Sequence, residues 1–209
     1  MIPYAQSPAL VRAKLLQLRP TQFSVGFAEV AAKAADWKRL KKKDRAQAIE
    51  SHVFPAVLGL DHEFYITDHH HLGLALLQEG VKDVWVTKLD DMSWLEPQIF
   101  WRTLEFRGWA HLYDQQGRRR TFIDMPRKLT QLKDDPYRSL AGLVRVSGGY
   151  AKDETPFSEF LWADFFRPHI ARNQIKSQQN QAVRAAIKLA HSRRARYLPG
   201  WICNKDGRK

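Results

Sequence analysis

The chain has 209 residues, and 44% of them are hydrophobic, enough for a buried core. Its formal net charge of +12 indicates an anionic partner, with nucleic acid or a nucleotide as the first expectation. The single cysteine, Cys203, excludes a disulfide framework and is typical of a cytoplasmic protein. No apolar run approaches the roughly 20 residues that span a bilayer, so we expect no membrane partner.

Residues 9–90 predict alternating helices and strands. A helix is expected over residues 23–40, where Phe27, Val30, Ala31 and Ala34 form the stripe of a core-facing helix. The other expected elements are a charged helix at 41–49, strands at 53–59, 64–67 and 81–86, and a helix at 72–79. Because only a short turn at 61–63 separates two strands, the pattern predicts an α/β fold with a mixed sheet.

The composition changes after residue 90. An aromatic segment at 94–109 is followed by a predicted hairpin, whose turn is at 114–117. The helices expected beyond it cover residues 128–132, 139–146, 157–167 and about 172–196. We therefore predict a compact domain at 9–90 and a mainly helical, aromatic-rich and basic region at 91–209 packed on it. Trp94, Trp101 and Trp109 are expected in the core, with a base-stacking groove as the alternative.

Three clusters carry much of the positive charge: 38–43, 118–120 and the segment from residue 167 onward. Any one of them is most simply a solvated surface, but together they favour contact with a polyanion. Arg184 and Lys188 share a face of the last predicted helix. With Arg193 and Arg194, they are the expected nucleic-acid-binding residues.

A run of four ionisable residues, Asp68 to His71, joins the strand at 64–67 to the helix expected from Leu72. The N-terminus of a helix is an anion site, because it presents backbone N–H groups and the positive end of the helix dipole. Asp68 could cap the helix, bind a metal ion or hold a proton, and the histidines could act as acid, base or ligand. A cap or a backbone hydrogen bond would explain at least one of the histidines equally well.

Three segments resemble the ParB/sulfiredoxin superfamily, and in particular its stand-alone group of ParB-like nucleases. Residues 18–22 (Leu-Arg-Pro-Thr-Gln) resemble the opening L-x-P-x-Q element, and residues 25–30 resemble the start of a helix that bears an acidic residue in related free serine kinases. Residues 65–71 (Tyr-Ile-Thr-Asp-His-His-His) resemble a strand followed by Asp-Gly-His-His-Arg. In that superfamily this junction binds nucleotide phosphates or supports phosphoryl transfer or hydrolysis.

The resemblance implies roles for individual residues. Glu29, Asp68, His70 and His71 are the expected catalytic residues, and Glu29 and Asp68 would also bind Mg²⁺. The nucleotide would be ATP, ADP or CTP, and the expected phosphate- and nucleotide-binding residues are Gln22, Lys33, His69 and Leu72. The sequence departs from the pattern at His69, where the family has glycine, and at Leu72, where it has arginine. A carboxylate at Glu29 is also what the helix dipole favours, and Lys33 one turn later makes an ordinary i,i+4 pair.

The expected function is therefore an enzyme of phosphate chemistry: nucleotide hydrolysis, phosphoryl transfer or phosphodiester cleavage. The alternative is a non-catalytic nucleic-acid-binding protein of the partition type, whose basic C-terminal segment contacts phosphates. An adaptor that keeps the fold without activity is a third reading.

Overall fold

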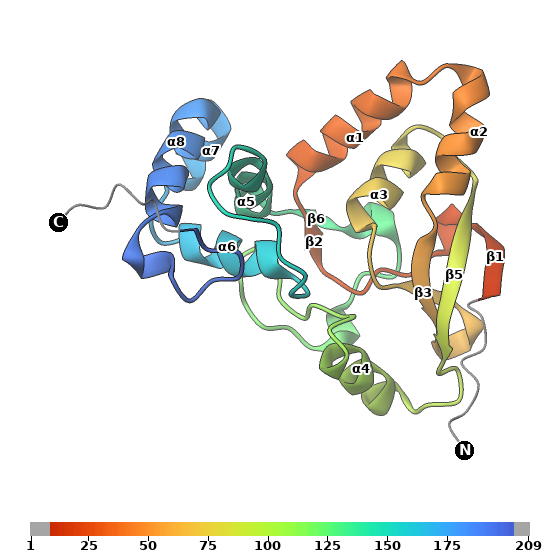
Figure 1. Cartoon of the computed structure of the whole chain (residues 1–209). Helices are drawn as coiled ribbons and strands as arrows, with labels where there is room; N and C mark the ends of the chain where they lie inside the picture. Colours follow the sequence, from red (N-terminus) through yellow and green to blue (C-terminus); the bar gives the residue numbers. More distant parts are fainter. Residues whose placement is uncertain (1–8, 203–209) are drawn as a thin grey trace. The chain divides into compact units, whose positions relative to one another are not determined.

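The computed structural model describes residues 9–202, which form two compact units (Figure 1). Residues 9–24 and Val30–Lys133 make the first unit, and Val25–Glu29 with residues 134–202 make the second. The chain therefore passes between the units at 24/25, 29/30 and 133/134. The expected boundary at residues 90 and 91 does not coincide with this division.

A four-stranded mixed sheet is the centre of the first unit. Its strands lie in the order β1, β5, β3, β4, with bounds Ala9–Lys14, Asp83–Asp91, Phe54–Leu58 and Phe64–Ile66. β5 pairs with β1 in antiparallel and with β3 in parallel orientation, and β3 pairs with β4 in antiparallel orientation. The predicted α/β fold with a mixed sheet is confirmed.

Pro55 lies inside β3, although proline cannot donate a hydrogen bond to a ladder. The pairing between β3 and β4 ends at Ala56 and Ile66, one residue short of Pro55. Beyond that point the Pro55 carbonyl accepts the Thr67 N–H at 2.9 Å. Pro55 therefore lacks an N–H only where its regular pairing with β4 has ended. After β4 the chain leaves the sheet and continues into the residues that precede the next helix.

The helices α2, α3 and α4 belong to the first unit, and α1 passes through the unit boundary after Glu29. Their bounds are Phe27–Arg39 for α1, Lys42–Ser51 for α2, His70–Gln78 for α3 and Pro97–Phe106 for α4. The stripe expected on α1 is partly wrong. Val30, Ala34 and Trp37 are buried, whereas Phe27 and Ala31 are exposed, so the buried face follows i, i+4 and i+7.

An aromatic cluster joins α4 to the end of the sheet. Tyr65, Phe100 and Trp101 are buried and meet edge to face, with ring centroids 4.9 to 5.7 Å apart. The expectation of core tryptophans holds for Trp101 but is wrong for Trp94, which is 79% exposed.

The second unit is helical. Its helices are α5 Pro136–Val146, α6 Ser158–Phe166, α7 Arg172–Ser177 and α8 Gln179–Ala190. The single helix expected over 172–196 is wrong, because the chain leaves helical geometry at Gln178 (φ −137°, ψ 46°). Trp162 on α6 is fully buried at the centre of this core and stacks on Tyr150 at 4.1 Å.

Short elements complete the structure. A two-stranded sheet of β2 (Ser24–Val25) and β6 (Lys133–Asp134) lies where the chain passes from one unit to the other. The 3₁₀ helices are Leu15–Gln17, Leu60–His62, Phe122–Asp124, Leu129–Gln131 and Arg193–Ala195. Tyr113 and Arg119 bridge in antiparallel fashion across the turn at 114–117, where the hairpin was expected. Among the described residues, no helix is long and apolar enough to cross a membrane.

Candidate functional site

The junction between β4 and α3 differs in one detail from the expectation. The helix begins at His70, two residues before Leu72, and His69 is its N-cap. Asp68 does not cap the helix, because its Oδ1 accepts the N–H of the adjacent His69 at 2.6 Å. The Asp68 side chain is 76% exposed, so its carboxylate faces solvent beside the first turn of α3.

His69 has a left-handed backbone, with φ at +66°. Glycine adopts this conformation without strain, which is a physical reason for the glycine of the resembling pattern. The imidazole meets the ring of Phe54 edge to face, with centroids 5.6 Å apart. Burial lowers the pKa of His69, more than the nearby Asp68 raises it. His69 Nδ1 lies 3.9 Å from Asp68 Oδ2, and the side chain is 36% exposed. His69 is therefore a neutral imidazole with access to solvent and a carboxylate beside it.

His70 is buried and has a different environment. Its Nε2 accepts the backbone N–H of Thr21 at 3.0 Å, so the ring proton is on Nδ1. The Thr21 hydroxyl also contacts this nitrogen but donates its own proton to the Ile66 carbonyl at 2.8 Å. Burial lowers the pKa of His70 to about 3. His70 is thus a neutral acceptor that links residue 21 to the start of α3.

Two of the three segments that carry the family resemblance meet here. Residues 19–21 run parallel to β4: the Arg19 N–H donates to the Phe64 carbonyl at 2.8 Å, and the Ile66 N–H donates to the Arg19 carbonyl at 2.9 Å. Gln22, an expected phosphate-binding residue, is buried, and its Nε2 donates to the Ser24 carbonyl at 2.8 Å. The side-chain amide of Gln22 is therefore bonded to the backbone of its own loop, two residues further along the chain.

Three further expected residues belong to the same unit. Lys33 on α1 lies close enough for its charge to contribute to the lowered pKa of His69. Leu72 is half-buried in the first turn of α3, and His71 is buried with 8% exposure. The ionisable groups beside the largely buried first turn are thus the Asp68 carboxylate, the His69 ring and the Lys33 ammonium.

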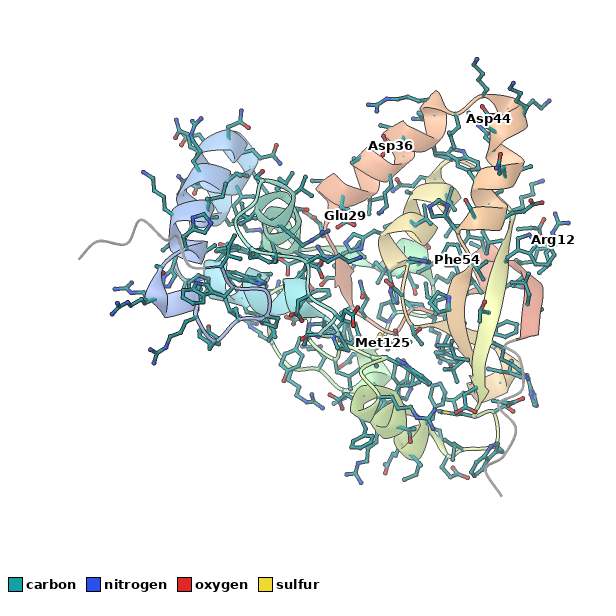
Figure 2. All side chains as sticks on the ribbon, viewed as in Figure 1. Arg12, Glu29, Asp36, Asp44, Phe54 and Met125 are labelled. Atoms are coloured by element: carbon teal, nitrogen blue, oxygen red, sulfur yellow. The ribbon has the colours of Figure 1, made fainter. Side chains whose placement is uncertain are left out.

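Glu29 belongs to the second unit, in the first turn of α1 (Figure 2). Its Oε2 lies 3.3 Å from Nη1 of Arg138, whose Nη2 lies 3.8 Å from Glu159. Asp68 is in the first unit, so the expected pair of Mg²⁺ ligands falls on different units. Within residues 9–202, no group of three or more His, Cys, Asp or Glu side chains could hold a metal ion. Glu29 and Asp68 therefore do not form a metal site within one unit, and the binding of Mg²⁺ stays a prediction.

The expected nucleic-acid-binding residues lie on the second unit. Ala182, Ala186 and Ala190 bury one face of α8, while Arg184 and Lys188 are exposed on another. Arg193 and Arg194 are exposed as well and follow in the 3₁₀ helix after α8. None of these four cations forms an ion pair with a carboxylate of the described chain.

Residues 11–168 match the model of a protein family described as "Putative ParB-like nuclease". The chain belongs to this ParB-like family. A solved structure, the "Crystal structure of protein Atu1540 from Agrobacterium tumefaciens", is 42% identical with a TM-score of 0.87. The match covers 95% of this ParB-like chain and 100% of the other. No curated protein matches.

Sequence reasoning missed Thr21 and Arg138. The backbone N–H of Thr21 donates to the His70 ring, and its hydroxyl donates to the carbonyl of Ile66 on β4. The feature of the sequence that points to Thr21 is its place inside the L-x-P-x-Q-like element. Arg138, with 9% side-chain exposure, bridges two carboxylates. It follows Asp135-Pro136, a helix-start signal, but nothing in the local sequence indicates its distant partners.

Proposed function

We propose that this ParB-like protein cleaves phosphodiester bonds of nucleic acid at the first turn of α3. The observation that supports this most is the contrast between two adjacent histidines. His70 is buried and holds a backbone N–H, whereas His69 is neutral, partly exposed and 3.9 Å from a carboxylate. A general base at neutral pH needs an accessible unprotonated nitrogen, and His69 has one.

The proposed chemistry uses groups around this turn. N–H groups at the start of a helix and the Lys33 ammonium would attract a phosphate. His69 would take a proton from the attacking water, whose oxygen forms a new bond to phosphorus. The bond to the leaving oxygen breaks, and the imidazolium returns the proton to that oxygen. Asp68 would stabilise the imidazolium while it exists. The catalytic roles of Glu29 and His71, and the binding of ATP, ADP or CTP, remain predictions.

Cleavage of labelled single-stranded DNA, duplex DNA and RNA, each with Mg²⁺ and with EDTA, tests the proposal. His69→Ala should lower the cleavage rate by about 10²- to 10⁴-fold. The matched control is His62→Ala, because His62 is exposed and also has a positive φ of 55°. Both substitutions therefore keep a non-glycine residue in a left-handed conformation. Unchanged cleavage by His69→Ala, or no cleavage of any substrate by the wild type, would refute the proposal.

A second candidate function is nucleic-acid binding without catalysis. The supporting observation is a set of exposed cations on α8 and after it that form no ion pair within residues 9–202, namely Arg184, Lys188, Arg193 and Arg194. Salt-sensitive binding by a wild type that cleaves nothing would favour this function.

A further inference from the structure

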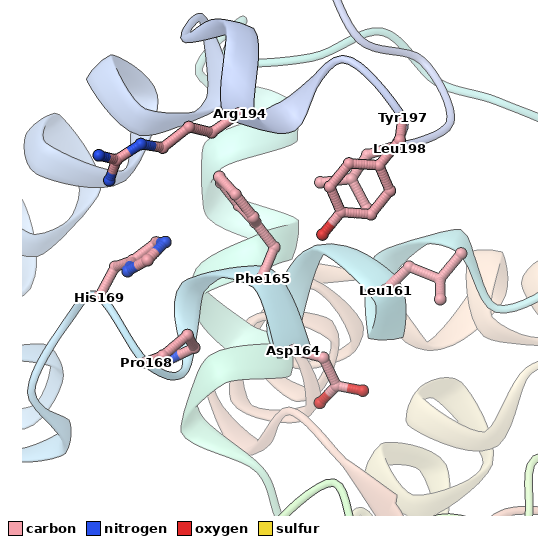
Figure 3. Close-up of a pocket in the computed structure, with 8 residues that line it drawn as sticks. All are labelled: Leu161, Asp164, Phe165, Pro168, His169, Arg194, Tyr197 and Leu198. Atoms are coloured by element: carbon pink, nitrogen blue, oxygen red, sulfur yellow. The ribbon is translucent and has the colours of Figure 1, made fainter.

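A surface pocket of about 430 Å³ lies wholly within the second unit, in the range of ligand-binding clefts (Figure 3). Its walls come from α6, from the loop after α6 and from the turn that follows α8. They combine apolar, aromatic and charged groups, of which the principal ones are Leu161, Asp164, Phe165, His169, Arg194 and Tyr197.

Aromatic and aliphatic groups make one part of the pocket. Tyr197 is 71% exposed and Leu161 is 46% exposed, and both line the pocket. Phe165 is buried and supports the Tyr197 ring edge to face, with centroids 6.4 Å apart. The tyrosine therefore offers a ring face at the surface while its position is supported from beneath.

The polar groups are unevenly distributed around the pocket. Figure 3 shows the Arg194 guanidinium and His169 on one side of it and Leu161 and Tyr197 on the other, so a ligand that contacts both Tyr197 and Arg194 would span the pocket. Asp164 is the one acid in the wall, and its Oδ1 lies 3.0 Å from Nη2 of Arg167, which is shared with Asp135 at 2.9 Å and so offsets only part of the charge of Asp164. Arg194 forms no ion pair within residues 9–202. Within the described chain, the pocket thus combines the Arg194 cation, which forms no ion pair, with a carboxylate whose charge is partly offset.

The surroundings extend this charge. Between residues 165 and 202 the sequence contains eight lysines and arginines and no acidic residue. All except Arg167 are exposed and lack an ion pair in the described chain, and they are Arg172, Lys176, Arg184, Lys188, Arg193, Arg194 and Arg196. The unit that carries the pocket therefore exposes a net positive segment to an anionic polymer.

We propose that this pocket binds a base of a single-stranded nucleic acid, stacked on Tyr197, with the adjoining phosphate held by Arg194. An exposed aromatic ring beside cations is how proteins bind unpaired strands, because every base has a face that can stack and every nucleotide has a phosphate. A duplex hides its base faces and could use only the cations. The inference concerns binding in the second unit and does not require cleavage at α3.

The test is fluorescence anisotropy with a labelled oligothymidylate in EDTA, with the oligonucleotide checked by gel to be intact. Tyr197→Ala should raise Kd about tenfold, and Tyr197→Phe, which keeps the ring, should stay within about twofold. On an abasic strand of equal length, wild type and Tyr197→Ala should bind equally. Equal binding of oligothymidylate by both proteins, or an equal loss on the abasic strand, would overturn the proposal.

Arg194→Ala tests the phosphate contact. It should reduce the slope of log Kd against log salt by about 0.7, the value for one phosphate of a single strand. The control Arg102→Ala removes the same charge from an exposed site in the first unit, outside the three basic clusters, and should leave most of the slope. If both variants had the same slope, Arg194 would act only through its net charge, and the proposed contact between Arg194 and a phosphate would be overturned. Because these measurements use an uncleaved strand, their outcome is independent of the nuclease assay.

Discussion

His70 should make the stability of the protein depend on pH. A free histidine has a pKa near 6.5, and burial lowers that of His70 to about 3. Between these values the unfolded state binds a proton that the folded state does not, so stability is complete above pH 6.5 and decreases as the pH falls toward 3. We expect this residue to contribute a slope of up to about 1.4 kcal/mol per pH unit in that window.

Urea unfolding at about pH 7, 6 and 5 measures this slope. The comparison is with His70→Gln, whose side-chain oxygen can accept the Thr21 N–H but does not titrate. The variant should lose less stability on acidification than the wild type. Parallel curves for the two proteins would show that His70 is not the group responsible.

The left-handed backbone at His69 leads to a second prediction. His69→Gly and His69→Ala both lose the ring contact with Phe54, but only alanine retains the steric strain at φ +66°. The glycine variant should therefore be more stable than the alanine variant by about 1 kcal/mol. Urea denaturation measures the difference, and the same pair of substitutions at His62 should give a similar value. A more stable alanine variant would contradict the strain argument.

At the scale of elements, α8 has one face that packs in the core and another that exposes positive charge. Its buried alanines pack in the core, while Arg184 and Lys188 are exposed four residues apart. The double charge reversal Arg184→Glu and Lys188→Glu should weaken binding to unrelated nucleic-acid sequences and flatten the salt dependence by about 0.7 to 0.9 for each lost phosphate contact. Unfolding free energy should change by less than about 0.5 kcal/mol. Unchanged binding would make this face a solvated surface only.

Most elements could be predicted from sequence because hydrophobic period and turn residues are local properties. The strands at 54–58 and 64–66 have this signal. The break at Gln178 was missed, although Ser177 and Asn180 on either side of it have low helix propensity, because no proline or glycine marks the end of the first helix. The start of α3 was misplaced because a histidine, not a glycine, adopts the left-handed conformation. The junction was found from its residue types, but the different environments of His69 and His70 depend on Phe54 and Thr21, which are remote in sequence.

At the scale of the whole molecule, Arg138 holds together parts of the second unit that are far apart in the chain. Arg138→Leu would remove this cation from Glu29 and Glu159, which are 30% and 24% exposed, while Arg145 would still pair with Glu159 at 3.2 Å. We expect a loss of about 2–3 kcal/mol in unfolding free energy, less than for a fully buried pair. Adding Glu29→Gln should recover part of the loss.

A matched control is Arg107→Leu, which breaks the exposed pair with Asp90 and should cost less than about 1 kcal/mol. Chemical denaturation of the three variants decides between the two kinds of pair. If Arg138→Leu is as mild as Arg107→Leu, the bridge is not important for the stability of the second unit.

The membership of Val25–Glu29 in the second unit also has a consequence for the order of events during synthesis. Glu29 and Arg138 are separated by 109 positions. At about 5–20 residues per second, a ribosome needs roughly 5–20 s to make the residues between them. Throughout that interval the nascent chain carries Val25–Glu29 while Arg138 has not yet been made, and the strands on either side of this segment in sequence can already begin to pair. The residues after 134 therefore complete a unit whose first piece, Val25–Glu29, is made before nearly all of the first unit's helices and strands.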